Sequence, residues 1–148
     1  MIPLPKYIDE IRSDLQLVES LDMEVGSIRL YDNNIVESTI KKDVVVDVQF
    51  LLSGKVWLEK LRPGEKFYIL NQSPAFHRVT KEARRLSANA AFADHLAAIA
   101  LIIGHPTTKL ILDLFLKIDK PVTPLKPFTD KEAALKWLLE RKAFDTKK

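Results

Sequence analysis

Short apolar runs alternate along this chain with longer segments of helical periodicity, and this alternation restricts the possible folds most strongly. Residues Ser27–Asp32 and Ile35–Ile40 alternate in polarity, and Asn33-Asn34 between them is typical of a tight hairpin turn. Three further runs, bounded by Gly, Pro or polar residues, are expected to be strands: 66–70, 98–103 and part of 120–128. Because helical segments separate these runs, the sequence predicts an α/β fold with a mixed sheet of about five strands.

The first helical segment after the hairpin is the hardest to assign. Residues 44–52 fit both a strand and a helix, because their valines alternate along the chain while Val48 and Leu52 share one helical face. We favour a helix that Asp47 caps and that runs to about Leu61, where an Arg-Pro-Gly sequence ends it.

Three later helices complete the order β-β-α-β-α-β-α-β-α. Thr80 can cap a helix that runs from Lys81 to about Ala93. The next helix is expected to begin near Thr107 and to end near Ile118. The last one, over 131–143, follows a capping box at Thr129–Glu132.

Residues 1–22 are expected to be an N-terminal amphipathic helical extension that precedes a single domain of residues 23–148. Four apolar residues recur there at the spacing of one helical stripe, with charged residues around them: Ile8, Ile11, Leu15 and Val18.

The composition argues against several kinds of chemistry. The chain has no cysteine, which removes disulfides, thiolate catalysis and cysteine-ligated metal sites. Its histidines, His77, His95 and His105, have no metal-ligand spacing, and its four glycines are too scattered for a phosphate-binding loop. The serines lack the context of a catalytic nucleophile. We therefore expect no metal, no cofactor and no enzymatic activity.

Location and broad partner class follow from hydropathy and charge. No signal peptide is apparent, and no apolar stretch approaches the roughly 18 residues that a membrane span needs. The net charge of +3 is spread over segments that also carry acidic residues, without interleaved aromatic residues. The sequence therefore predicts a cytoplasmic protein with no membrane span and no nucleic-acid partner.

Two polar segments follow predicted strands and are candidates for binding a ligand or an anion. Ligands of open α/β sheets bind outside the carboxyl ends of the strands, where helix N-termini also offer free amide groups. The candidate residues in these two segments are Asn71, Ser73, His105, Thr107, Thr108 and Lys109. The alternative is purely structural, because Thr107 can cap the following helix while Pro106 fixes its first turn.

The predicted helix 107–118 is more apolar than a helix that covers one sheet should be. Lys109, Asp113 and Lys117 form one narrow polar stripe. The apolar candidates for an interface are Leu110, Leu112, Leu114, Phe115 and Leu116. A surface helix needs an apolar face of only about 100°. This helix should therefore pack against a neighbouring helix, a second copy or other protein, with a homodimer favoured, or an apolar ligand.

The order of the predicted elements resembles the STAS domain, the fold of the SpoIIAA-like proteins. Two segments carry a closer resemblance to small bacterial SpoIIAA-like proteins: Val79–Arg84, which reads VTKEAR, and Ile99–Leu138. The resemblance spans roughly Gly26 to Lys142 and leaves the first 22 residues outside. It implies a STAS (SpoIIAA-like) fold and a module that acts by binding partners, since members of that family switch between protein partners and some bind nucleotides or lipids.

The resemblance also draws attention to phosphorylation. Phosphorylated members carry an Asp-Ser-Ser/Thr-Gly motif at the start of the second sheet-packed helix. This chain has Thr80-Lys81-Glu82-Ala83 there, so the glycine is absent and only Thr80, one step from the expected place, offers a hydroxyl. Thr80 is the phosphorylation candidate, with helix capping as its alternative role.

Together these observations predict a non-enzymatic binding or regulatory module that acts through protein–protein contacts. The alternative is a carrier of a small apolar ligand or lipid, held between the sheet and the helix 107–118.

Overall fold

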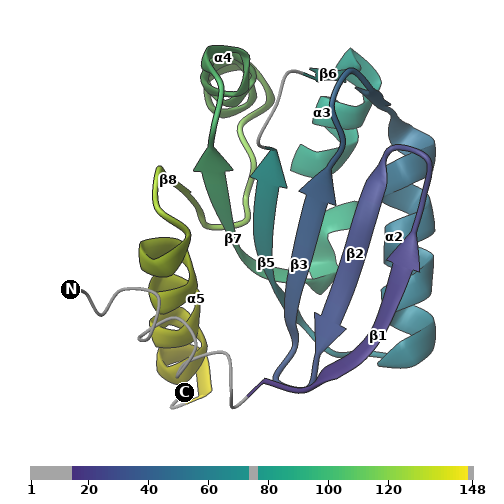
Figure 1. The fold of residues 1–148 in the computed structure, drawn as a ribbon, viewed down its shortest axis with the longest axis vertical. Coiled ribbons are helices and arrows are strands. Elements are labelled where there is room, and N and C mark those ends of the chain that lie inside the picture. The colour runs from purple at the N-terminus through teal and green to yellow at the C-terminus, as the bar shows by residue number, and fades with distance from the viewer. Residues whose placement is uncertain (1–14, 74–76, 147–148) are drawn as a thin grey trace.

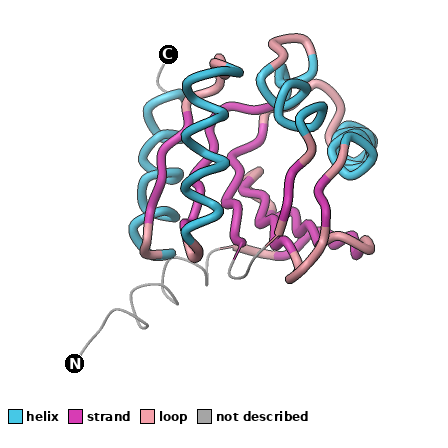
Figure 2. The backbone as a smooth tube through the Cα atoms, turned by 90° about the horizontal axis from the view of Figure 1, so that it is seen from above, coloured by secondary structure: helices cyan, strands magenta, loops and turns pink. Residues whose placement is uncertain are grey.

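The structure is a computed structural model that describes residues 15–73 and 77–146 (Figures 1 and 2). Within these residues a mixed sheet has the strand order β1-β2-β3-β5-β7-β8. Its six strands are β1 (Leu17–Asp22), β2 (Gly26–Tyr31), β3 (Ile35–Ile40), β5 (Phe67–Ser73), β7 (Leu96–Ile103) and β8 (Leu125–Phe128). The first three strands pair antiparallel, and β3, β5, β7 and β8 run parallel. The expected α/β fold with a mixed sheet is confirmed.

The described residues also form four α-helices and several shorter elements. The α-helices are α2 (Val48–Leu61), α3 (Lys81–Ala88), α4 (Pro106–Leu114) and α5 (Lys131–Thr146). The shorter elements are the 3-10 helix η1 (Phe92–His95), the π-helix η2 (Phe115–Asp119), and the two-residue parallel strands β4 (Val45–Val46) and β6 (Arg78–Val79). Apart from the short β4–β6 pair and the two short helices, the chain from β2 onward follows the predicted order of strands and helices.

Two local predictions of the sequence are confirmed. The hairpin between β2 and β3 turns at Asn34, whose φ of 69° is in the left-handed region that asparagine tolerates. The ambiguous segment is mostly helix, because the Asp47 carboxylate accepts a hydrogen bond from the Phe50 amide at 3.2 Å and caps α2. Its valines Val45 and Val46 instead form β4.

The N-terminal part of the sheet differs from the prediction. The expected helix lies largely in residues 1–14, outside the described residues, but its last part is wrong because Leu17 and Val18 belong to β1. This sixth strand pairs with β2 at the edge of the sheet. Leu17 and Val18 are exposed there, so backbone pairing with β2, and not burial of an apolar stripe, stabilises the segment.

Three helix boundaries also differ. Helix α3 ends at Ala88 because the Asn89 side chain accepts a hydrogen bond from the Phe92 amide and starts η1. The predicted helix 107–118 is α-helical only to Leu114 and continues as a π-helix. The α5 cap is Asp130 and not Thr129, since the Asp130 carboxylate accepts from the amides of residues 132 and 133.

The sheet has a hydrophobic cluster on each face. Side chains of α5 cover one face, where Ala98 and Ala100 of β7 contact Ala134 and Leu138. Side chains of α2 cover the other face, where Phe50 packs against the apolar residues of β2 and β3. Helix α4 lies beyond the carboxyl end of β7 (Figure 1), and its continuation η2 contacts α3. The carboxyl ends of the parallel strands therefore meet α3 and α4.

Candidate functional site

A cavity of about 160 Å³ lies at this end of the sheet, on the side that α2 and α3 cover. The sheet contributes Asn71 and Ser73 from β5 and Ile99 and Leu101 from β7. The helices contribute Phe50 and Leu51 from α2, Arg84 and Ser87 from α3, Thr108, Ile111 and Leu112 from α4, and Phe115 from η2. Aliphatic and aromatic groups form most of the wall, which is the usual character of a small-molecule site.

Helix α4 and the π-helix η2 that continues it present two different faces. Thr108, Ile111, Leu112 and Phe115 recur at helical spacing and line the cavity. The large apolar residues on the other side are exposed to solvent, with 64 % exposure at Leu110 and 62 % at Ile118. The interface candidates from the sequence therefore divide into two groups. Leu112 and Phe115 line the cavity, and Leu110, Leu114 and Leu116 point outward.

The π-helix η2 connects the floor of the cavity to α3. Its first residue, Phe115, lines the cavity, and its last residue, Asp119, accepts a hydrogen bond from Arg84 Nε at 3.1 Å. This ion pair is buried, with side-chain exposures of 14 % for Arg84 and 2 % for Asp119. Lys120 ends the turn at a φ of 52° and donates its amide to the Phe115 carbonyl. The Arg84 charge that borders the cavity is thus neutralised by Asp119.

The polar groups of the cavity are few, and three of them are deeply buried. Ser73 is 3 % exposed, and its hydroxyl donates to Asn71 Oδ1 at 3.4 Å. His77 is 5 % exposed and also faces the cavity. Thr108 is 4 % exposed, and its Oγ1 has no hydrogen-bond partner among the described residues. A buried hydroxyl without a partner is uncommon and costs free energy, so its position at the cavity wall requires an explanation.

The structure brings only part of the predicted polar set together. Asn71, Ser73 and Thr108 come from two separate segments and meet at the cavity, as expected for the carboxyl end of a parallel sheet. Lys109 is exposed, and His105 is partly buried outside the cavity lining. The Thr107 side chain lies outside the description.

Thr80 has the alternative role that the sequence offered. Its Oγ1 accepts a hydrogen bond from the Ala83 amide at 3.0 Å and caps α3. Its phosphorylation stays a prediction.

Sequence reasoning missed Arg84 and His77 as parts of the site. Arg84 follows the Thr80 cap by four residues, so it lies one helical turn into α3, and that spacing was the available signal for its position. The signal could not reveal Asp119 as the partner, because Asp119 lies 35 residues away in the sequence. His77 follows a strand but belongs to no motif that would single it out.

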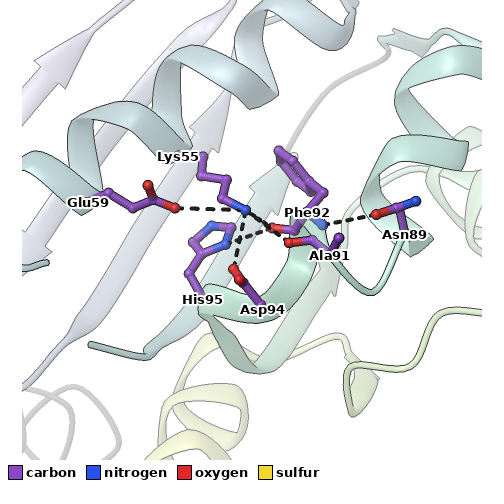
Figure 3. Close-up of polar contacts among 7 residues, drawn as sticks. All are labelled: Lys55, Glu59, Asn89, Ala91, Phe92, Asp94 and His95. Atoms are coloured by element: carbon purple, nitrogen blue, oxygen red, sulfur yellow. Dashed lines mark hydrogen bonds and ion pairs between the residues drawn. The ribbon is translucent and has the colours of Figure 1, made fainter. Parts of the chain in front are cut away.

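A second cavity of about 120 Å³ lies between α2 and the sheet and shares Phe50, Leu51, Asn71 and Ser87 with the first. Lys55 and His95 lie on its far side. Figure 3 shows that Lys55 reaches from α2 to η1, where its ammonium group donates to the carbonyls of Ala91 and Phe92 and to Asp94 Oδ1. It also lies 4.9 Å from the centre of the Phe92 ring.

His95, the last residue of η1, also belongs to this cluster. It is 7 % exposed, and its Nδ1 lies 3.0 Å from the Phe92 carbonyl (Figure 3). Burial lowers the pKa of His95, and the Lys55 charge lowers it further, so the neutral imidazole is favoured. The hydrogen bonds of Lys55 are all directed to η1 and its neighbours, which indicates that this cluster holds η1 against α2.

The described residues contain no group of three or more histidine, cysteine or carboxylate side chains that could hold a metal ion. Among the same residues, no helix is both long enough and apolar enough to cross a bilayer.

Comparison with known proteins gives one match. A family model described as a domain of unknown function (DUF7793) matches residues 29–142. The match includes α3, α4, η2 and all the cavity residues named above. No curated protein and no solved structure matches the chain.

Proposed function

The chain belongs to the DUF7793 family, and we propose that it is a non-enzymatic module that holds a small, largely apolar molecule between the sheet and α4. The observation that carries this proposal is the apolar cavity of about 160 Å³ at the carboxyl ends of β5 and β7. An engineered apolar cavity of about 150 Å³ in another protein is large enough to bind benzene. A molecule of about that size would fill this cavity.

The polar groups of the cavity support binding and not catalysis. The Ser73 hydroxyl is directed to Asn71 Oδ1 and thus to an amide oxygen, not to a base of the kind that activates a serine nucleophile. Arg84 is held by Asp119. The order of strands and helices supports a STAS-type fold as part of the proposal, with a ligand-binding role of the kind that some members of that family have.

The test uses native mass spectrometry on the full chain purified from its own cells. We expect an added mass that is lost on denaturation. The variant Leu112→Phe should lose this mass because Leu112 is 5 % exposed and lines the cavity. The matched control Leu110→Phe makes the same chemical change on the outward face, where Leu110 is 64 % exposed, and should retain the mass.

Circular dichroism of both variants would establish that they are folded. If the wild-type protein carries no added mass, and if toluene and benzyl alcohol leave the amide NMR signals of α4 unchanged, the proposal is wrong.

A second candidate function is protein–protein contact through the outward face of α4, including formation of a homodimer. The observation that favours it is a group of large apolar side chains exposed along α4, η2 and the loop that follows: Leu110, Leu114, Leu116, Ile118 and Val122. Sedimentation analysis of the wild type and of Leu110→Ser/Ile118→Ser tests it. Association in the wild type that the double variant loses would support this function, and a wild-type monomer at high concentration with no captured partner would contradict it. A cytoplasmic location and the absence of nucleic-acid partners stay predictions.

A further inference from the structure

The cavity wall contains a buried hydroxyl group, that of Thr108, which makes no hydrogen bond to the described protein. Thr108 lines the cavity and is only 4 % exposed, and its Oγ1 is buried in the wall without a hydrogen-bond partner among the described residues. A hydroxyl can donate one hydrogen bond and accept others. The remaining wall around it is largely aliphatic, from Ile111, Leu112 and Leu101. A ligand group that bonds to Thr108 would remove the cost of this buried hydroxyl.

The electrostatics of the wall restrict the charge of that ligand. Among the described residues that line the cavity, Arg84 is the only lysine or arginine. Its guanidinium group donates to the buried Asp119 carboxylate at 3.1 Å. A second anion in the cavity would have to compete with Asp119 for Arg84 or rely on His77, the other described lining residue that can carry a positive charge, and would otherwise be uncompensated. Burial of an uncompensated charge costs several kcal/mol even after relaxation. The lining therefore favours a neutral ligand.

On the basis of the proposed function, we propose that the ligand is a small neutral molecule with an apolar body and one hydroxyl group, which hydrogen-bonds to Thr108 Oγ1 when rotation about χ1 turns the threonine hydroxyl into the cavity. The volume of about 160 Å³ limits the body to about one aromatic ring or an aliphatic group of similar size. Ser73 and Asn71 belong to the part of the wall that β5 forms, and they are hydrogen-bonded to each other.

The experiment measures the binding of three probes that share one ring: toluene, benzyl alcohol and benzoate. Dissociation constants come from NMR titration of the full chain at pH 7, followed on the amide signals of α4. The decisive quantity is the ratio of toluene to benzyl alcohol dissociation constants in the wild type and in Thr108→Val. Thr108→Val keeps the shape of the side chain and removes its hydroxyl, so this ratio should fall by roughly twofold to tenfold, the value of one net hydrogen bond.

A matched control keeps the comparison specific. Thr123 is also buried, at 7 % exposure, but it does not line this cavity, so Thr123→Val should leave the ratio unchanged. Benzoate should bind at least tenfold more weakly than benzyl alcohol because of its charge.

The outcomes separate this inference from the function on which it rests. If no probe binds and the native protein carries no added mass, the proposed ligand-binding function is wrong. If toluene and benzyl alcohol bind but Thr108→Val leaves their ratio unchanged, the cavity binds ligands and the role of Thr108 is wrong. If benzoate binds more tightly than benzyl alcohol, the neutral character of the ligand is wrong.

Discussion

Strand β7 has very different surroundings on its two sides. Ala98 and Ala100 point toward α5 and are completely buried, at 0 % exposure. Ile99 and Leu101 are larger and more apolar, but they face the cavity and remain partly exposed. If the apolar area of each side chain alone decided its burial, Ile99 and Leu101 would be more deeply buried than the two alanines. The difference shows that the covering helices, and not the hydrophobicity of the strand, decide how tightly each face is packed.

Small residues explain the tight face. Ala134 on α5 meets the alanines of β7, so the helix and the sheet approach closely, and Leu135 and Leu138 fill the space beside them. The end of α5 is tied to the sheet as well, because the Tyr68 hydroxyl donates to Asp145 at 2.7 Å. Burial, together with this hydrogen bond, raises the pKa of Tyr68 to about 12. On the cavity face, α3 and η2 are joined by one ion pair.

The largest expected effect comes from breaking that ion pair on the cavity face. Asp119→Asn leaves the buried Arg84 guanidinium without its carboxylate, so we expect the free energy of unfolding to fall by about 3 kcal/mol or more. Urea denaturation measures the loss. The control Glu59→Gln removes an exposed carboxylate that lies 3.8 Å from Lys55, which keeps its other hydrogen-bond partners, and should cost less than about 1 kcal/mol. Equal effects of the two substitutions would show that the cavity face does not depend on this ion pair.

The next prediction adds the same number of carbon atoms to each side of β7. Ala100→Leu overpacks the tight face and should lower the free energy of unfolding by about 1–3 kcal/mol. Leu101→Phe directs the added atoms into the cavity and should cost less than about 1 kcal/mol. Both values come from urea denaturation. A larger cost for Leu101→Phe than for Ala100→Leu would contradict the contrast between the two faces.

A smaller change in the free energy of unfolding is expected when valine replaces threonine at two positions, and its sign should differ between them. Thr108→Val replaces a buried hydroxyl that has no partner in the described protein, and should stabilise the ligand-free fold by about 1 kcal/mol. Thr80→Val removes the α3 cap and should destabilise the fold by about 1 kcal/mol. Thermal unfolding of ligand-free protein measures both. Destabilisation by Thr108→Val would indicate that its hydroxyl has a partner in solution.

The smallest expected effect concerns pH and the helix-covered face near α2. Burial and Lys55 lower the pKa of His95, whereas Asp94, Glu59 and the Phe92 carbonyl act in the opposite direction. Below its ordinary pKa of about 6.5, the unfolded chain therefore binds more protons at this residue than the folded protein does. Stability from His95 should be complete above that pH and should decrease as the pH falls below it.

The comparison between wild type and His95→Gln isolates this contribution. The melting temperature of the wild type should fall more steeply between pH 7.5 and about 5 than that of the variant, which has no imidazole to protonate. Parallel curves for the two proteins would mean that protonation of His95 does not affect stability.

The sequence predicts those parts of the molecule that depend on local patterns. The hairpin at Asn34, the Asp47 cap and the order of strands and helices from β2 onward follow from polarity, turn residues and capping residues close together in the chain. The helix expected over the residues that form β1 was wrong because these residues pair with β2 as the outer strand of a hairpin and leave apolar side chains exposed, which polarity patterns do not anticipate. The π-helix was missed because it begins as a regular continuation of α4.

The sequence predicts at which edge of the sheet the site lies, but not how its wall is formed. The rule for carboxyl ends of parallel strands places Asn71, Ser73 and Thr108 together. It cannot say which of the two apolar rows on α4 faces inward, because both rows have the same spacing. The choice depends on the contact between η2 and α3, and thus on the pairing of Arg84 with Asp119, which are distant in sequence.

The π-helix also makes the site sensitive to chain length and not only to residue type. In a regular α-helix each residue advances by about 100°, so deletion of one residue within 115–119 would turn the following positions by that angle. The inward row from Thr108 to Leu112 would be unchanged, but Asp119 would no longer face Arg84. Among relatives, a single-residue deletion at this point would thus separate chains that retain the ion pair from chains that must close the cavity by other means.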